Sequence, residues 1–207
     1  MRGQRPTTLR AVFEECQKGH QNLTKLLAAL RNIHATHTDP AQFQAEFIHY
    51  LKHSLVVFRR EPAVERTLEF VAKFAGSFAT EAGSGSDEEK ENTGGNKKFH
   101  MDLFDFLLKS HNANSQAVRF RACQLINKML NALGEDAEVD DDLYDRIFEC
   151  MLMRLRDKIP AIRVQAVLAL TRLQDPSDQS CAVITAYQYL LGCDPNPDVR
   201  RAILSCI

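Results

Sequence analysis

Basic residues are the side chains whose spacing in this sequence suggests chemistry, because they gather in three groups that are nearly free of acids. Lys52, Arg59 and Arg60 lie close together, and the stretch 109–128 holds no Asp or Glu. The third group spans 154–163, with Asp157 as its one acid. Clustered cations bind a nucleic-acid backbone by releasing counterions, without reading base sequence. We therefore consider eight candidate contacts to duplex DNA: Arg59, Arg60, Lys109, Arg119, Arg121, Lys128, Arg156 and Lys158.

The motifs of common enzymes are missing from the sequence. No Gly-x-Ser-x-Gly stretch occurs, so a hydrolase nucleophile elbow is not indicated. The run Gly83–Ser86 lacks the Lys-Ser/Thr pair of a phosphate-binding loop and follows no predicted strand. We predict that the chain is not an enzyme and has no cofactor and no small-molecule substrate.

Two groups of residues could hold a metal ion, but each has a simpler interpretation. His49 and His53 are four residues apart and could share a helix face, yet no glutamate stands between them as in His-Glu-x-x-His. Asp140, Asp141 and Asp142 could bind a cation, but acids are also stabilising at a helix N-terminus. The six cysteines form no Cys-x-x-Cys pair and are interpreted as reduced thiols, mostly in the core. We predict no metal site.

Apolar residues recur at spacings of three and four along most of the chain, which predicts amphipathic helices. Asp39-Pro40, Pro62 and Pro160 mark helix starts, and Asn114 is the expected cap of another helix. The formal net charge is −1, so the molecule as a whole is not a basic nucleic-acid binder. No apolar run reaches the roughly 18 residues that a membrane span needs.

A short motif recurs where second helices of pairs are expected to begin. Ala117–Ala122 and Ala161–Ala166 both contain apolar-Arg-x-x-Ala, and Asp198–Ala202 opens the same way with its alanine one place early. The motif arginines are 44 and 37 residues apart, which is close to the roughly 40–47 residues of HEAT repeats. We predict an all-α HEAT-repeat superhelix over residues 1–207, a single solenoid of about five helix pairs. Because the apolar pattern continues to Ile207, we expect it to be incomplete at its C-terminus.

The motif arginines have a structural alternative to DNA contact. At this position an arginine often pairs with an acid of the neighbouring repeat, and that pairing is the favoured interpretation for Arg119, Arg163 and Arg200. The other candidates, Arg121 and Lys128 among them, are freer of this constraint.

Residues 81–97 are rich in Gly, Ser, Asn and acids and contain no large apolar side chain. Such a segment cannot bury enough surface to offset its ordering entropy, so we predict a disordered acidic loop within the solenoid. Ser86 precedes three acids, a context that suits phosphorylation by acidophilic kinases. The alternative is a plain solubilising insertion.

Several blocks of the sequence resemble the HEAT-repeat subunits of condensin, specifically the N-terminal region of the G-type subunit of condensin I. The resemblance covers almost the whole chain and is weakest at residues 1–20 and 81–96. It is carried by these blocks: Glu46–Lys52, Arg60–Arg66, Phe106–His111, Ala117–Arg121, Asp157–Pro176 and Asn196–Arg201.

The resemblance implies functions that periodicity does not show. The family subunit is a longer, harp-shaped solenoid that binds the kleisin subunit, and the two hold double-stranded DNA in a basic groove. ATP hydrolysis belongs to the SMC ATPase subunits, which this subunit reaches through the kleisin. The implied location is the nucleus and mitotic chromosomes, with the cytoplasm for part of the cell cycle. The alternative is a HEAT scaffold that recognises only protein segments, without nucleic acid.

Overall fold

The computed structural model describes residues 6–19, 22–78, 89–134, 140–174, 177 and 181–207, and the regular elements in these ranges are all helical. No helix of this described part is long and apolar enough to cross a membrane. A 3-10 turn, Thr171–Leu173, extends α8. The α-helices are α1 (Leu9–Cys16), α2 (Leu23–Thr36), α3 (Pro40–Leu55), α4 (Pro62–Gly76), α5 (Glu89–Ser110), α6 (Gln116–Ala132), α7 (Asp141–Arg154), α8 (Pro160–Leu170), α9 (Ala182–Cys193) and α10 (Pro197–Leu204).

The predicted starts of three helices are confirmed, and one predicted cap is wrong. Helices α3, α4 and α8 begin at prolines, and the Asp39 carboxylate accepts hydrogen bonds from the backbone of Ala41 and Gln42. The cap residue of α6 is Ser115, not Asn114, and its side chain makes no capping bond. The Asn114 carbonyl instead accepts a hydrogen bond from Arg119, which places this residue in the turn.

Part of the predicted acidic loop is helical. Helix α5 begins at Glu89, so the loop prediction is wrong from there to residue 97, whereas residues 79–88, with Ser86, lie outside the described part. Phe99, Leu103 and Leu107 bury one face of α5 and fix the helix downstream. Extending an existing helix adds one hydrogen bond per residue fixed. The polar segment can therefore lengthen α5 at its N-terminal end at little cost.

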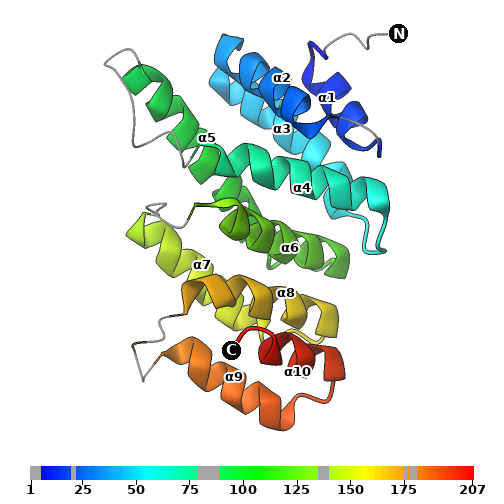
Figure 1. The fold of residues 1–207 in the computed structure, drawn as a ribbon, viewed down its shortest axis with the longest axis vertical. Helices are drawn as coiled ribbons and strands as arrows, with labels where there is room; N and C mark the ends of the chain where they lie inside the picture. The colour runs from blue at the N-terminus through cyan, green and yellow to red at the C-terminus, as the bar shows by residue number, and fades with distance from the viewer. Residues whose placement is uncertain (1–5, 20–21, 79–88, 135–139, 175–176, 178–180) are drawn as a thin grey trace.

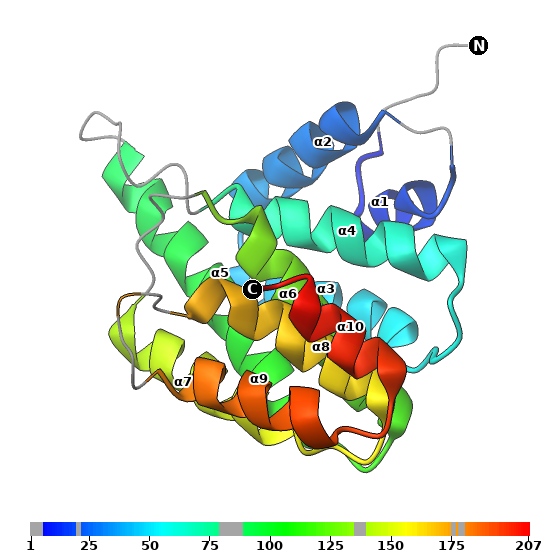
Figure 2. The ribbon, with the colours of Figure 1, turned by 60° about the horizontal axis from the view of Figure 1, so that its bottom comes forward.

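The helices form two layers (Figure 1, Figure 2). Helices α4, α6, α8 and α10 pack successively against one another, and α3, α5, α7 and α9 form the second layer. Turns that join the two helices of a pair lie along one edge, at the right of Figure 1, which we name the turn edge. The C-terminal ends of α4, α6 and α8 lie at the opposite edge. The predicted all-α solenoid of paired helices is confirmed for the described residues.

The core changes character along the stack. Its N-terminal part is a cluster of phenylalanine rings around His34, with ring centroids 4.8–6.2 Å apart: Phe43, Phe47, Phe74, Phe78 and Phe99. From α6 onward aliphatic side chains dominate, including Ile126, Ile147, Ile162, Val167 and Ile203.

Candidate nucleic-acid interface

The first motif arginine, Arg119, is buried and paired. Its guanidinium donates to both carboxylate oxygens of Asp157, at 2.9 and 3.3 Å, from α6 to the α7–α8 turn. A third nitrogen donates to the carbonyls of Ala113 and Asn114, both at 2.9 Å. Arg119 therefore fastens its own turn to the turn of the following pair.

The second motif arginine repeats this arrangement one pair further on. Arg163 donates to both oxygens of Asp194, each at 2.7 Å, and to the Asp157 carbonyl at 2.8 Å. Arg200 donates to the backbone carbonyl of Asp194. The predicted pairing with an acid of the next repeat is confirmed for Arg119 and Arg163, and for Arg200 the described bond is to a carbonyl of its own turn. These contacts form an arginine–aspartate ladder.

The aspartates of the ladder keep their charge although they are buried. Burial would raise the pKa of Asp157 and Asp194. This effect of burial is outweighed by hydrogen bonds from Arg119 and Arg163, by a backbone N–H at each site and by nearby positive charge. The pKa of each aspartate therefore lies below its ordinary value.

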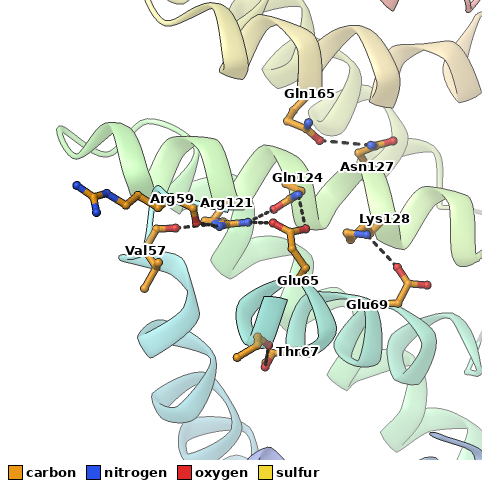
Figure 3. Close-up of polar contacts among 11 residues, drawn as sticks. Val57, Arg59, Glu65, Thr67, Glu69, Arg121, Gln124, Asn127, Lys128 and Gln165 are labelled. Atoms are coloured by element: carbon orange, nitrogen blue, oxygen red, sulfur yellow. Dashed lines mark hydrogen bonds and ion pairs between the residues drawn. The ribbon is translucent and has the colours of Figure 1, made fainter. Parts of the chain in front are cut away.

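Arg121 lies two residues beyond the motif arginine, and none of its side chain is exposed. It donates to the carbonyls of Val57 at 2.7 Å and Arg59 at 2.6 Å, both in the α3–α4 turn. It also donates to Glu65 of α4 at 2.5 Å and to Gln124 of α6 at 2.6 Å (Figure 3). Arg121, which belongs to the following helix pair, thus fixes the turn before α4.

The burial of Arg119 and Arg121 contradicts the prediction that they contact DNA. Arg119 is 7% exposed and Arg121 is 0% exposed. The hydrogen-bond donors of both guanidiniums point at carbonyls and carboxylates inside the fold. The expectation that Arg121 is the freer of the two is also wrong, because α6 turns it toward α4.

Lys128 lies away from the turn edge. Its ammonium donates a hydrogen bond to Glu69 at 2.9 Å, and its side chain is 25% exposed. This hydrogen bond is the main cause that lowers the pKa of Glu69. Asn127 beside it reaches Gln165 of α8 at 3.5 Å (Figure 3). The groove at this place measures about 540 Å³ and is lined by Glu69, Lys73, Gly76, Ser77, Asn127, Lys128, Asn131 and Ala132.

The remaining five candidates are exposed and gather at the turn edge. Arg59 and Arg60 lie in the α3–α4 turn, Lys109 in the last turn of α5, and Arg156 and Lys158 in the α7–α8 turn. Exposed Lys52 joins them, with its ammonium 5.8 Å from the centre of the Phe106 ring. Of the acids along this edge, Asp157 in the α7–α8 turn and Asp194 in the α9–α10 turn are buried in the ladder, and Glu61 in the α3–α4 turn is exposed. The turn edge therefore presents mainly positive charge.

The groups considered for metal binding have structural roles or lie on the surface. The Asp140 carboxylate accepts a hydrogen bond from the backbone of Leu143 at 3.4 Å, and two further acids follow in the first turn of α7. This confirms the helix-terminus interpretation. The rings of His49 and His53 are exposed, with centroids 5.3 Å apart. No cluster of three or more potential ligands occurs among the described residues.

Sequence reasoning missed the partners of the buried arginines. A signal for the aspartates exists, because Asp157 and Asp194 each stand three residues before a proline that begins a helix. Arg59 occupies the equivalent place before Pro62. No comparable pattern marks Arg121, whose acceptors other than Gln124 lie 56–64 residues earlier in the chain.

Comparison with known proteins gives a consistent result. No family model matches the chain. It is 53% identical over 200 residues to condensin complex subunit 3 of Homo sapiens, which covers 97% of the chain and 19% of that protein. Identity to the Schizosaccharomyces pombe protein of the same name is 29% over 187 residues, covering 90% of the chain and 19% of that protein. The chain thus spans about a fifth of the length of these relatives.

A solved structure agrees with the fold. The crystal structure of the S. pombe condensin Cnd3–Cnd2 subcomplex is similar to this chain, with a TM-score of 0.73 and 26% sequence identity. The similarity covers 95% of this chain and 23% of the matched chain. The similarity therefore extends from sequence to the arrangement of the helices.

Proposed function

Because the chain belongs to the family of condensin complex subunit 3, we propose that it is part of a non-catalytic condensin subunit that binds double-stranded DNA. In this proposal the subunit acts with a kleisin subunit, anchors condensin to chromosomes and thereby serves mitotic chromosome condensation. It acts in the nucleus and on mitotic chromosomes, and resides in the cytoplasm for part of the cell cycle.

The observation that carries the DNA proposal is the separation of charge at the turn edge. Five predicted contacts and Lys52 are exposed there, whereas Asp157 and Asp194 of the α7–α8 and α9–α10 turns are buried against arginines. Exposed cations in successive turns can follow a phosphate backbone, because the turns repeat at each helix pair. Such contacts bind DNA without selecting a sequence.

A second subunit fits the same proposal. The structurally similar S. pombe protein was crystallised as a Cnd3–Cnd2 subcomplex, which supports a stable partner for this family. We propose that the partner here is the kleisin, that it closes over DNA lying along the basic surface, and that the SMC ATPases are reached through it.

Salt titration of DNA affinity tests the proposal. The measurement is the dissociation constant for a paired duplex at increasing NaCl concentration, with the protein alone and with the kleisin subunit. Each phosphate contact contributes about 0.9 to the slope of log K against log salt. The Arg59→Gln, Arg60→Gln, Arg156→Gln, Lys158→Gln variant should therefore weaken binding and lower the slope by up to about 4.

The control removes two cations that lie outside the turn edge. Lys73, in the last turn of α4, and Lys97, in the N-terminal half of α5, are both exposed. The Lys73→Gln, Lys97→Gln variant should bind duplex with the wild-type slope. Salt-independent binding, or no binding even with the kleisin present, would support the alternative of a scaffold for protein segments only.

A further inference from the structure

The α3–α4 turn differs from the later turns because it exposes apolar side chains among its cations. Val56 is 63% exposed and Phe58 is 36% exposed, directly before Arg59 and Arg60. The described residues that join α5 to α6, α7 to α8 and α9 to α10 expose no large hydrophobic side chain, and the exposed Met153 lies within α7. An exposed aromatic ring beside several cations matches a ligand that carries both negative charge and flat apolar faces.

The ring of Phe58 is held in position. It packs edge-on against Phe120 of α6, with centroids 5.3 Å apart and ring planes at 69°. The other support is Arg121, whose guanidinium carbon lies 5.1 Å from the centre of the Phe120 ring. Arg121 also binds the carbonyls of Val57 and Arg59, on either side of Phe58 (Figure 3). The turn is therefore preorganised, and binding need not first order it.

We propose that the Val56–Arg60 turn binds unpaired nucleotides, with a base stacked on Phe58 and contacted by Val56. The neighbouring phosphates pair with Arg59, Arg60 and Lys52. This inference rests on the proposed DNA function and adds a preference for a class of DNA. A fully paired duplex hides its base faces, so it offers this turn only its phosphates.

The two functions can share one DNA molecule. A duplex backbone lies along the later cations of the turn edge, Lys109, Arg156 and Lys158, and an unpaired stretch reaches the α3–α4 turn. Stacking on an aromatic side chain accepts every base, so the preference is for unpaired structure and not for sequence.

The test compares two DNAs of equal length and charge, one fully paired and one with a central bubble of mismatched bases. The readout for each protein variant is the ratio of the two dissociation constants, measured by fluorescence anisotropy at one salt concentration. Wild type should bind the bubble about fivefold or more tightly than the paired duplex, since stacking contributes about 1–3 kcal/mol per base. Phe58→Leu keeps an apolar side chain against Phe120 but should bring the ratio to one, whereas Phe58→Trp should retain it.

The outcomes separate this inference from the proposed function. Equal affinity of wild type for both DNAs, with salt-dependent binding of each, overturns the inference and leaves duplex binding standing. A bubble preference that persists in Phe58→Leu overturns the assignment to this turn. If there is no bubble preference and Phe58→Leu instead weakens binding of the kleisin subunit, the turn is a protein contact. Failure to bind either DNA removes the proposed function as well.

Discussion

The junction between the α3–α4 and α5–α6 pairs is built differently from the two junctions that follow it. Later pairs are joined by the arginine–aspartate ladder, in which Arg119 and Arg163 reach forward to an aspartate of the next turn. At the earlier junction Arg121 reaches backward and binds two backbone carbonyls and Glu65. Both arrangements connect neighbouring turns, but only in the ladder is the acceptor an acidic side chain of the turn itself.

This difference determines which side chains remain on the surface. Asp157 and Asp194 turn inward, so their negative charge is neutralised by arginines, and the exposed charges of the α7–α8 turn are Arg156 and Lys158. In the α3–α4 turn, the equivalent position is Arg59, whose carbonyl is bound by Arg121 while its side chain is exposed. Two different packing solutions therefore give a basic turn edge.

The largest expected effect comes from breaking the earlier junction. Arg121→Ala leaves the Glu65 carboxylate and the Val57 and Arg59 carbonyls without their donor. We expect the free energy of unfolding to fall by about 3–5 kcal/mol, measured by urea denaturation, because one partner of a buried pair is removed. The control Arg59→Ala truncates an exposed side chain and should change stability by less than about 0.5 kcal/mol. Similar stabilities for the two variants would show that Arg121 does not hold the turn.

The ladder should respond nearly as strongly. Asp157→Ala removes the acceptor of Arg119 and Arg154 and of the Ile159 backbone N–H, and should cost about 3 kcal/mol. Its control is Asp198→Ala, which breaks an exposed pair with Arg201 and should cost less than about 1 kcal/mol. Thermal and urea unfolding would both report the difference, and equal costs would rule out the ladder as a main support of the C-terminal pairs.

Helix spacing gives a third contrast between the regions. A Cβ added to Gly76 in α4 would lie 2.6 Å from the carbonyl oxygen of Ala132 in α6. Gly76→Ala should therefore destabilise the protein by about 2 kcal/mol through overpacking. Gly192 in α9 has no atom within 4 Å of the added Cβ, so Gly192→Ala should stabilise it by up to about 1 kcal/mol through helix propensity. Effects of the same sign in urea unfolding would contradict this.

The smallest effect concerns pH and the N-terminal core. Burial lowers the pKa of His100 from 6.5 to about 4, so between these values the unfolded chain binds the proton and the folded chain does not. Stability should fall as pH drops, and His100→Phe should reduce the loss between pH 7 and pH 5.5 by about 1 kcal/mol. Exposed His49→Phe serves as the control. Stability curves of wild type and His100→Phe that stay parallel over this range would refute the prediction.

Much of the fold was predictable because its signals are local. Apolar spacing located the helices, and the prolines at positions 40, 62 and 160 marked their starts. The recurring arginine predicted the pairs that Arg119 and Arg163 make. The start of α5 was not predictable, since residues 89–97 have the composition of a loop and continue a helix fixed by side chains further along.

The sequence by itself determined the helices, their pairing and the abundance of cations near the turns. Only the tertiary structure decided which cations stay exposed. Arg121 and Arg59 are both arginines in basic stretches, yet the first is buried because three of its acceptors come from an earlier helix pair, up to 64 residues away. Whether a charge reaches the surface depends on how neighbouring helices cross and what acceptors they bring. That information is spread over several pairs and is absent from any local pattern.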